Sequence, residues 1–327
     1  MEKERYNHLN KYLKEMFGER TLKICIDASF TCPNRDGKVG TNGCIFCSEK
    51  GSGEHLNPLQ DSDIIYNNSN SPLTCSKNIN FITSSIQSQI KNHLNSYRGK
   101  RANKFIAYFQ NFTNTYDSLE NLKARYDSAL ISDKIVALAI ATRPDCIDES
   151  ICKLIASYKE KVYVWVELGL QTANNETGKL INRCYTSEQF SNAVELLNKY
   201  NIDVVTHIMV GHPNEKFEDI KNTVEFINKH NIQGLKIHSC YVIKNTILGE
   251  MYKNGDYTPI TLEYYLEMAT YILTHINPNI IIHKISGDAP KDLLLAPEWN
   301  LHKKWIMNGL EKTLKEKNLY QGYYYKK

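Results

Sequence analysis

Apolar residues in this 327-residue chain occur as short continuous runs that alternate with longer segments in which they are three or four positions apart. The short runs predict strands buried on both faces, as in a parallel sheet, and the longer segments predict helices that bury one face. The predicted strands are 22–28, 104–110, 134–141, 162–169, 202–210 and 234–242. The predicted helices are 81–97, 119–131, 148–158, 187–200 and 217–228. This order predicts six consecutive βα units.

The two ends of the chain and one connection depart from this alternation. An amphipathic helix is expected within the first 20 residues, and a helix at 260–276, a strand at 280–285 and a helix at 299–317 are expected after the last βα unit. The polar stretch 54–80 is rich in Asn and Ser and predicts a mobile insertion that contains Cys75. We therefore divide the chain into an N-terminal helical segment (1–21), a core (22–245) and a C-terminal α/β extension packed on the core (246–327).

The predicted fold is α/β, a partial (β/α)6 TIM-like barrel. No GxGxxG fingerprint is present, which disfavours a doubly wound dinucleotide fold. Functional residues of a parallel barrel lie at the C-terminal ends of its strands. Polar residues gather there after every predicted strand from the second onward, at 110–115, 141–145, 167–172, 206–215 and 236–246. One shared pocket at this end of the barrel is expected.

Composition and charge limit the class of protein, its cellular compartment and its partners. Hydrophobic residues make up 42% and charged residues 23%, as in globular proteins with a substantial core, and no apolar run is long enough for a membrane span. The charged N-terminus and the odd number of cysteines, nine, predict a reducing cytoplasm and no membrane partner. A net charge of +4 permits a nucleic-acid partner. The basic segments 91–104 and 321–327, the latter with three tyrosines, are candidate RNA contacts.

Three cysteines follow the first predicted strand in the segment CPNRDGKVGTNGCIFC, with the spacing C-x11-C-x2-C. Cys32, Cys44 and Cys47 are surrounded by turn-forming residues, so the loop can wrap around a metal centre. Zinc in a closed structural site takes four protein ligands, whereas three thiolates on a cubane iron–sulfur cluster leave one iron open. A zinc knuckle completed by a distant ligand and unrelated buried thiols remain alternatives. Cys25 lies inside the strand and is interpreted as a core residue.

This loop resembles that of the radical S-adenosylmethionine (SAM) enzymes, and the run C-P-N-R-D-G before a long gap is similar to the YhcC/YtqA-type group. Further motifs in the same order carry the resemblance, over about residues 5–305: FQ-x-x-TNTY, ATRPD, ELGLQT, HIM-x-G-x-P and HK-x-SGDAP. TRPD, E-x-G-x-Q and HIM also resemble the core of the Elongator catalytic subunit. One motif departs: related sequences read N-R-G-H where this chain has Asn182, Arg183, Cys184 and Tyr185.

The resemblance implies a [4Fe–4S] cluster bound by Cys32, Cys44 and Cys47, with SAM on the open iron. The cofactor-binding candidates are Phe46, Gln110, Thr142, Glu167, Gln171 and Met209. The resemblance places Phe46 to pack on adenine. Gln110 stands where the superfamily has Gly-Gly-Glu. The catalytic candidates are Arg143, Lys236 and His207. Arg143 and Lys236 are cations suited to a carboxylate. The alternatives for Arg143 and His207 are a structural salt bridge and a satisfied core histidine.

The implied activity is reductive cleavage of SAM to a 5′-deoxyadenosyl radical that abstracts hydrogen from a substrate. The resemblance points to tRNA, with conversion of carboxymethylaminomethyl-uridine to aminomethyl-uridine at the wobble position. It also implies a low-potential electron donor such as flavodoxin or ferredoxin, and a downstream tRNA methyltransferase. A radical SAM enzyme acting on a small metabolite or peptide, and a non-catalytic zinc-binding module, are the competing hypotheses.

Overall fold

The computed structural model describes residues 4–51 and 79–326. The predicted insertion at 54–80 and its Cys75 therefore lie outside the described residues, except for residues 79 and 80, which begin a helix.

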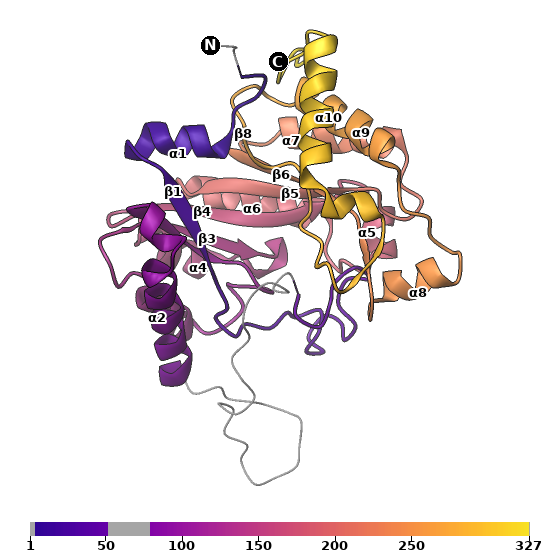
Figure 1. The fold of residues 1–327 in the computed structure, drawn as a ribbon. Helices are drawn as coiled ribbons and strands as arrows, with labels where there is room; N and C mark the ends of the chain where they lie inside the picture. Colours follow the sequence, from indigo (N-terminus) through magenta and orange to yellow (C-terminus); the bar gives the residue numbers. More distant parts are fainter. Residues whose placement is uncertain (1–3, 52–78, 327) are drawn as a thin grey trace.

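Seven parallel strands form one sheet that curls into a half-barrel with helices on its outer side (Figure 1). The strands, in spatial order, are β1 (Thr21–Ile26), β2 (Lys104–Phe109), β3 (Ile135–Thr142), β4 (Tyr163–Gln171), β5 (Asp203–Val210), β6 (Gly234–Ser239) and β8 (Ile281–Lys284). All six predicted core strands are present, and the partial barrel is confirmed. The seventh strand, β8, comes from the C-terminal part of the chain and pairs in parallel with β6. The sheet is thus one strand wider than predicted.

The helices follow the predicted periodicity, with ends shifted by a few residues. They are α1 (Leu9–Phe17), α2 (Ile79–Asn95), α3 (Leu119–Ala129), α4 (Glu149–Ala156), α6 (Ser187–Lys199), α7 (Phe217–Asn228), α9 (Leu262–His275) and α10 (Lys303–Glu316). Two short helices were not predicted, α5 (Asn175–Leu180) and α8 (Ile247–Lys253), because one or two turns carry too little periodic signal. A separate antiparallel pair joins β7 (Val242–Ile243) to β9 (Leu294–Ala296).

The two faces of the sheet differ in character. In β1, Leu22, Ile24 and Ile26 are buried in the large core shared with the outer helices, whereas Lys23 and Cys25 alternate with them and are only partly buried. Side chains of successive strand residues point to opposite faces, so Lys23 and Cys25 face the inside of the half-barrel. The inner face is apolar near the N-terminal ends of the strands, where α1 packs Leu9 and Leu13 on it, and charged farther along. The charged part can therefore belong to a functional site.

The C-terminal tail lies at the end of the half-barrel opposite to the cysteine loop. Gln321 is buried, accepts a hydrogen bond from the Asn7 backbone at 2.9 Å and donates to the Ile280 carbonyl, just before β8, at 2.7 Å. Tyr320, Tyr323 and Tyr324 are about half exposed. An RNA contact by these tyrosines stays a prediction. It would lie at the end of the half-barrel opposite to the cysteine loop. Among the described residues, no helix is both long and apolar enough to cross a membrane.

Candidate functional site

The cysteine loop leaves the C-terminal end of β1 and is closed by its own backbone. The Arg35 and Cys47 amides donate to the carbonyls of Cys32 and Cys44 at 2.8 and 2.9 Å. The side chain of Asn34 is fully buried, and a Cβ on Gly40 would lie only 2.3 Å from its Oδ1. Glycine at position 40 therefore lets the loop close over Asn34.

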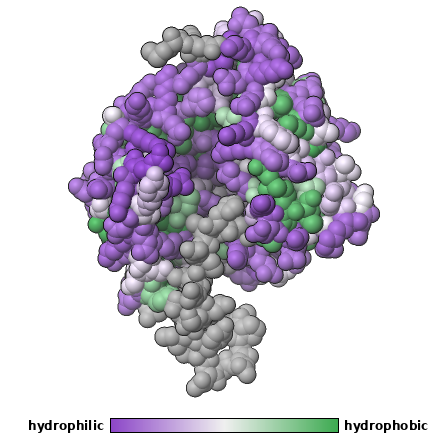
Figure 2. Space-filling model, in the orientation of Figure 1, coloured by the Kyte–Doolittle hydropathy of each residue, from purple (hydrophilic) through white to green (hydrophobic). Residues whose placement is uncertain are grey.

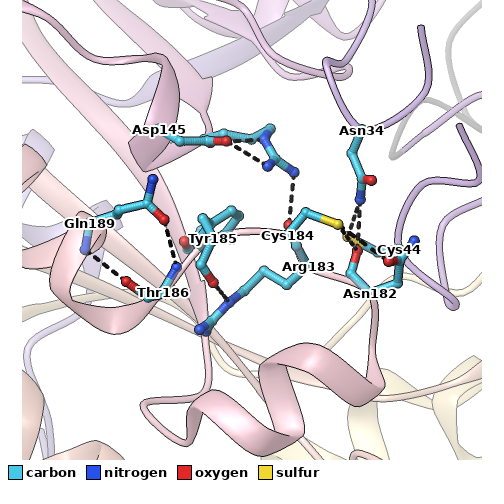
Figure 3. A network of polar contacts seen from close by, with 11 residues as sticks. Asn34, Cys44, Asp145, Asn182, Arg183, Cys184, Tyr185, Thr186 and Gln189 are labelled. Carbon is cyan, nitrogen blue, oxygen red and sulfur yellow. Dashed lines mark hydrogen bonds and ion pairs between the residues drawn. The ribbon is translucent and has the colours of Figure 1, made fainter. Parts of the chain in front are cut away.

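A second segment, residues 181–185 after α5, anchors the loop from outside. The amide of Ile45 donates to the Ile181 carbonyl at 3.1 Å, and Asn34 Nδ2 and Asn182 Nδ2 donate to the carbonyls of Asn182 and Gly43, each at 2.7 Å. Figure 3 shows this exchange beside the sulfur of Cys44. The cysteine loop is thus held against the segment that follows α5, far away in sequence.

The three thiols form a donor set suited to an iron–sulfur cluster. Burial raises the pKa of Cys44 to about 12, and the nearby thiols of Cys47 and Cys32 raise it further, so the three thiols lie close to one another. In the described parts of the chain, no three His, Cys, Asp or Glu side chains converge as the ligands of a single metal ion do. A cubane does not require such convergence, because each thiolate binds a different iron. The residues present fit a cluster, and the zinc alternative gains no support from them.

The predicted cofactor-binding residues come from the cysteine loop and from, or directly after, the strands β2 to β5. Phe46 and Met209 pack against one small apolar cluster that includes Ile45 and Ile181. Thr142, at the end of β3, shares a 2.6 Å hydrogen bond with Thr115, so its hydroxyl already has a partner. Gln110 directly follows β2, and Gln171 ends β4 with a left-handed backbone, φ 66°. Glu167 lies four residues before Gln171 on β4, about 13 Å along the strand, and the register places it opposite Ala141, next to Thr142.

Arg143 is held by its own neighbours. Its guanidinium forms two hydrogen bonds with Asp145, at 2.9 and 2.7 Å, and donates to the Arg183 carbonyl at 3.1 Å (Figure 3). It also lies 4.8 Å from the ring of Tyr185. This is the salt bridge that was the structural alternative for Arg143, and three of its donors are already engaged.

The structure shows how Cys184 and Tyr185 fit where related sequences have Gly and His. Cys184 adopts φ 60°, a left-handed conformation that favours glycine, the residue expected there from related sequences. Tyr185, in place of the expected histidine, donates its hydroxyl to the Gly169 carbonyl at 2.8 Å and lies against Arg143 and Arg183. The segment is therefore rebuilt around a tyrosine, at some backbone strain.

Cys184→Gly is expected to keep the fold and cluster binding. Relief of the left-handed strain, about 1 kcal/mol, is offset by a similar entropy gain of the unfolded chain. Chemical denaturation should give a free energy of unfolding within about 1 kcal/mol of the wild type. A larger loss, or loss of bound iron after reconstitution, would show that the Cys184 thiol has a role that its geometry does not reveal.

A charged cluster lies in the barrel interior below the cysteine loop, and Glu167 is its centre. We name it the Glu167 cluster; its members are Lys23, Tyr108, Trp165, Glu167, His207 and Lys236. Tyr108, His207 and Lys236 bond to Oε2 of Glu167, the first two at 2.7 and 2.8 Å. Trp165 donates to Oε1 at 3.0 Å, and the Lys23 ammonium lies 3.8 Å from the same oxygen.

Burial and the neighbouring charges set the protonation states of the groups in this cluster. Burial alone would raise the pKa of Glu167, but Lys236 and Lys23 hold it well below its usual value, so the group is a carboxylate. Burial, with Lys236 adding to it, lowers the pKa of His207 to about 4. A neutral His207 can bond to the carboxylate only through its Nε2–H, which leaves Nδ1 as an acceptor. Burial also lowers the pKa of Lys236, against the attraction of Glu167.

The sequence predicted three members of this cluster, Glu167, His207 and Lys236, and missed the other three. The role of Glu167 near the SAM ribose or amino group stays a prediction; in the structure both of its carboxylate oxygens already have partners. Lys23 was missed because its strand was interpreted as wholly apolar. The alternation of Lys23 and Cys25 with apolar residues was the available signal.

Comparison with known proteins places the site in a family. The model of the radical SAM superfamily matches residues 37–227, a range that contains Cys44, Cys47 and the polar ends of β2 to β5. The chain belongs to the radical SAM superfamily. The model of the Radical_SAM C-terminal domain matches residues 232–316. The division at 1–21, 22–245 and 246–327 stays a prediction.

Individual relatives confirm the narrower resemblance. The chain is 34% identical to the protein YtqA of Bacillus subtilis (strain 168), over 99% of this chain and 94% of YtqA. It is 31% identical to the tRNA uridine(34) acetyltransferase of Methanocaldococcus jannaschii, over 50% of this chain and 30% of that protein. The structure of Elp3 from Methanocaldococcus infernus superimposes with a TM-score of 0.59 at 22% identity, covering 73% of this chain and 60% of Elp3. This radical SAM protein is therefore of the YhcC/YtqA type and related to the Elongator core.

Proposed function

We propose that this radical SAM enzyme modifies tRNA and converts the carboxymethylaminomethyl side chain of the wobble uridine to aminomethyl. The observation that carries the proposal is the cationic interior of the barrel, where Lys23 and Lys236 face a single carboxylate. The 31% identity to a tRNA uridine(34) acetyltransferase supports tRNA as the substrate class.

In this proposal Cys32, Cys44 and Cys47 hold a [4Fe–4S] cluster. When bound, the cluster and SAM supply the radical that takes a hydrogen atom from the substrate. The apolar group of Phe46 and Met209 would pack on the adenine, with Gln110, Thr142 and Gln171 near the polar parts of SAM. A flavodoxin or ferredoxin would deliver the electron, and a tRNA methyltransferase would act on the product.

The residues of this chain then divide their roles by their surroundings. Arg143, fixed by Asp145 beside the cysteine loop, would present its remaining donors at the level of SAM. Lys236 and His207, in the Glu167 cluster, would face the substrate side chain. A substrate carboxylate entering this interior meets positive charge in a site of low dielectric, where the attraction is strong.

Deletion of the gene is expected to change the wobble uridine of tRNA. Nucleoside mass spectrometry of tRNA from the deletion strain should show carboxymethylaminomethyl-uridine accumulating and aminomethyl-uridine, with its methylated product, lost. Return of the wild-type gene should restore the pattern, and a copy with Cys44→Ala should not. An unchanged wobble uridine in a strain without a redundant enzyme would contradict the proposal and favour a small metabolite or peptide as substrate.

A further inference from the structure

The Glu167 cluster contains two lysines and one carboxylate. Lys236 Nζ bonds directly to Oε2 of Glu167, and Lys23 Nζ lies 3.8 Å from Oε1. The side chain of Glu167 is fully buried, that of Lys236 is 6% exposed, and that of Lys23 is 24% exposed. Two ammonium groups therefore share one carboxylate, and the Lys23 ammonium lies beyond hydrogen-bond distance from it.

The neighbouring titratable groups do not balance this surplus. His207, His238 and His283 are neutral, because burial lowers the pKa of each below its usual value. Lys284 is neutralised by Asp288 at 2.7 Å. Among the described residues, the carboxylates paired with lysines of this interior are Glu167 and Asp288. Burial also lowers the pKa of Lys236 to about 7, against the attraction of Glu167, to which Lys236 is hydrogen-bonded. Lys23 is thus the lysine of this cluster for which the described residues provide no hydrogen-bonded carboxylate.

Aromatic rings fix the position of that charge. Lys23 Nζ lies 5.0 Å from the ring centroid of Tyr108 and 5.9 Å from that of Trp165, and both rings attract a cation over their faces. Buried nitrogens nearby, Nε2 of His238 and Nδ1 of His283, have no hydrogen-bond partner among residues 4–51 and 79–326. Figure 2 shows the molecule hollowed between β1 and the C-terminal helices, over the middle strands of the sheet. A ligand can therefore approach from this hollow.

We propose that Lys23 and Lys236 form an anion subsite that selects substrates with a carboxylate, and that Glu167 holds the two ammonium groups in place. A carboxylate that enters between them balances the surplus charge. It also accepts charge-assisted hydrogen bonds from Lys23, and no hydrogen bond between Lys23 and Glu167 has to break for this. The inference rests on the proposed function only for the identity of that carboxylate, the one on the wobble-uridine side chain. The carboxylate of SAM has the same chemistry and is the competing source.

The test measures binding to the cluster-loaded, SAM-bound protein by calorimetry, with two nucleosides as probes: 5-carboxymethylaminomethyluridine and 5-aminomethyluridine. The wild type should prefer the first by about tenfold or more, as one hydrogen bond between charged groups provides. Lys23→Met should remove this preference, and Lys23→Arg should keep most of it. Lys14→Met, an exposed lysine on α1, is the matched control and should behave as the wild type.

Three outcomes decide the proposal. Tight binding of the carboxylated nucleoside by Lys23→Met, with the wild-type preference, would overturn it. A tenfold loss of SAM affinity in Lys23→Met, measured by equilibrium dialysis, would also overturn it, since the subsite would then serve SAM. Lys23-dependent binding of N-methylglycine, together with an unchanged wobble uridine in the deletion strain, would uphold the subsite while the proposed tRNA substrate fails.

Discussion

Replacing Cys32, Cys44 or Cys47 by alanine should abolish cluster binding. The wild type, reconstituted without oxygen, should hold about four iron atoms per chain and absorb at about 400 nm. Each alanine variant should lose nearly all of both signals, because two thiolates cannot hold a cubane whose remaining irons face solvent. Iron and acid-labile sulfide, assayed beside the absorbance, give the result without reliance on activity.

Two other cysteines serve as matched controls. Cys25 lies on the inner face of β1, and Cys146 follows β3 near Arg143; both are partly buried, as the three loop cysteines are. Cys25→Ala and Cys146→Ala should keep the full iron content. If either variant folds and still loses the cluster entirely, the assignment of the three loop cysteines is wrong.

The second large effect is expected on stability, from Glu167→Gln. The variant leaves the buried Lys236 and the partly buried Lys23 without their carboxylate. Removing one partner of a buried ion pair destabilises proteins by about 3–5 kcal/mol, and a loss in that range is expected at pH 7 by chemical denaturation. Lys236→Met added to Glu167→Gln should restore most of the loss, since it removes the unpaired buried charge.

The pH dependence of this effect has a definite sign. The pKa of Glu167 in the folded protein lies well below its usual 4.5, so its stabilising contribution is present above about pH 4.5 and is lost as the pH falls through the folded-state value. The difference between wild type and Glu167→Gln should therefore shrink in acid. Glu176→Gln is the control, because Glu176 pairs with Lys179 at 2.7 Å on the exposed surface, where a pair contributes under about 1 kcal/mol. A loss from Glu167→Gln as small as that of Glu176→Gln would contradict the role of Glu167 as the centre of the cluster.

The sequence by itself determined the βα order and the position of the cysteine loop. Strand and helix periods are local properties, and the turn residues around Cys32, Cys44 and Cys47 signal a loop within a few positions. The motif order carried the family resemblance, which the matched ranges confirm. Arg143 shows the limit of such reasoning. The motif T-R-P-D contains both Arg143 and its partner Asp145. Only the backbone geometry after β3 shows that the two side chains form a pair.

The tertiary structure decided what the barrel interior contains. Lys23, Tyr108, Glu167, His207 and Lys236 come from five different strands, and Lys23 is separated from Glu167 by more than half of the core. Their contacts depend on the register that pairs Lys23 with Ile106, Glu167 with Val205 and His207 with Lys236. A shift of one residue would turn each side chain to the helix-covered face. Register between distant strands is set by the packing of the whole sheet, so the surplus charge beside Glu167 was not visible in any single stretch of the chain.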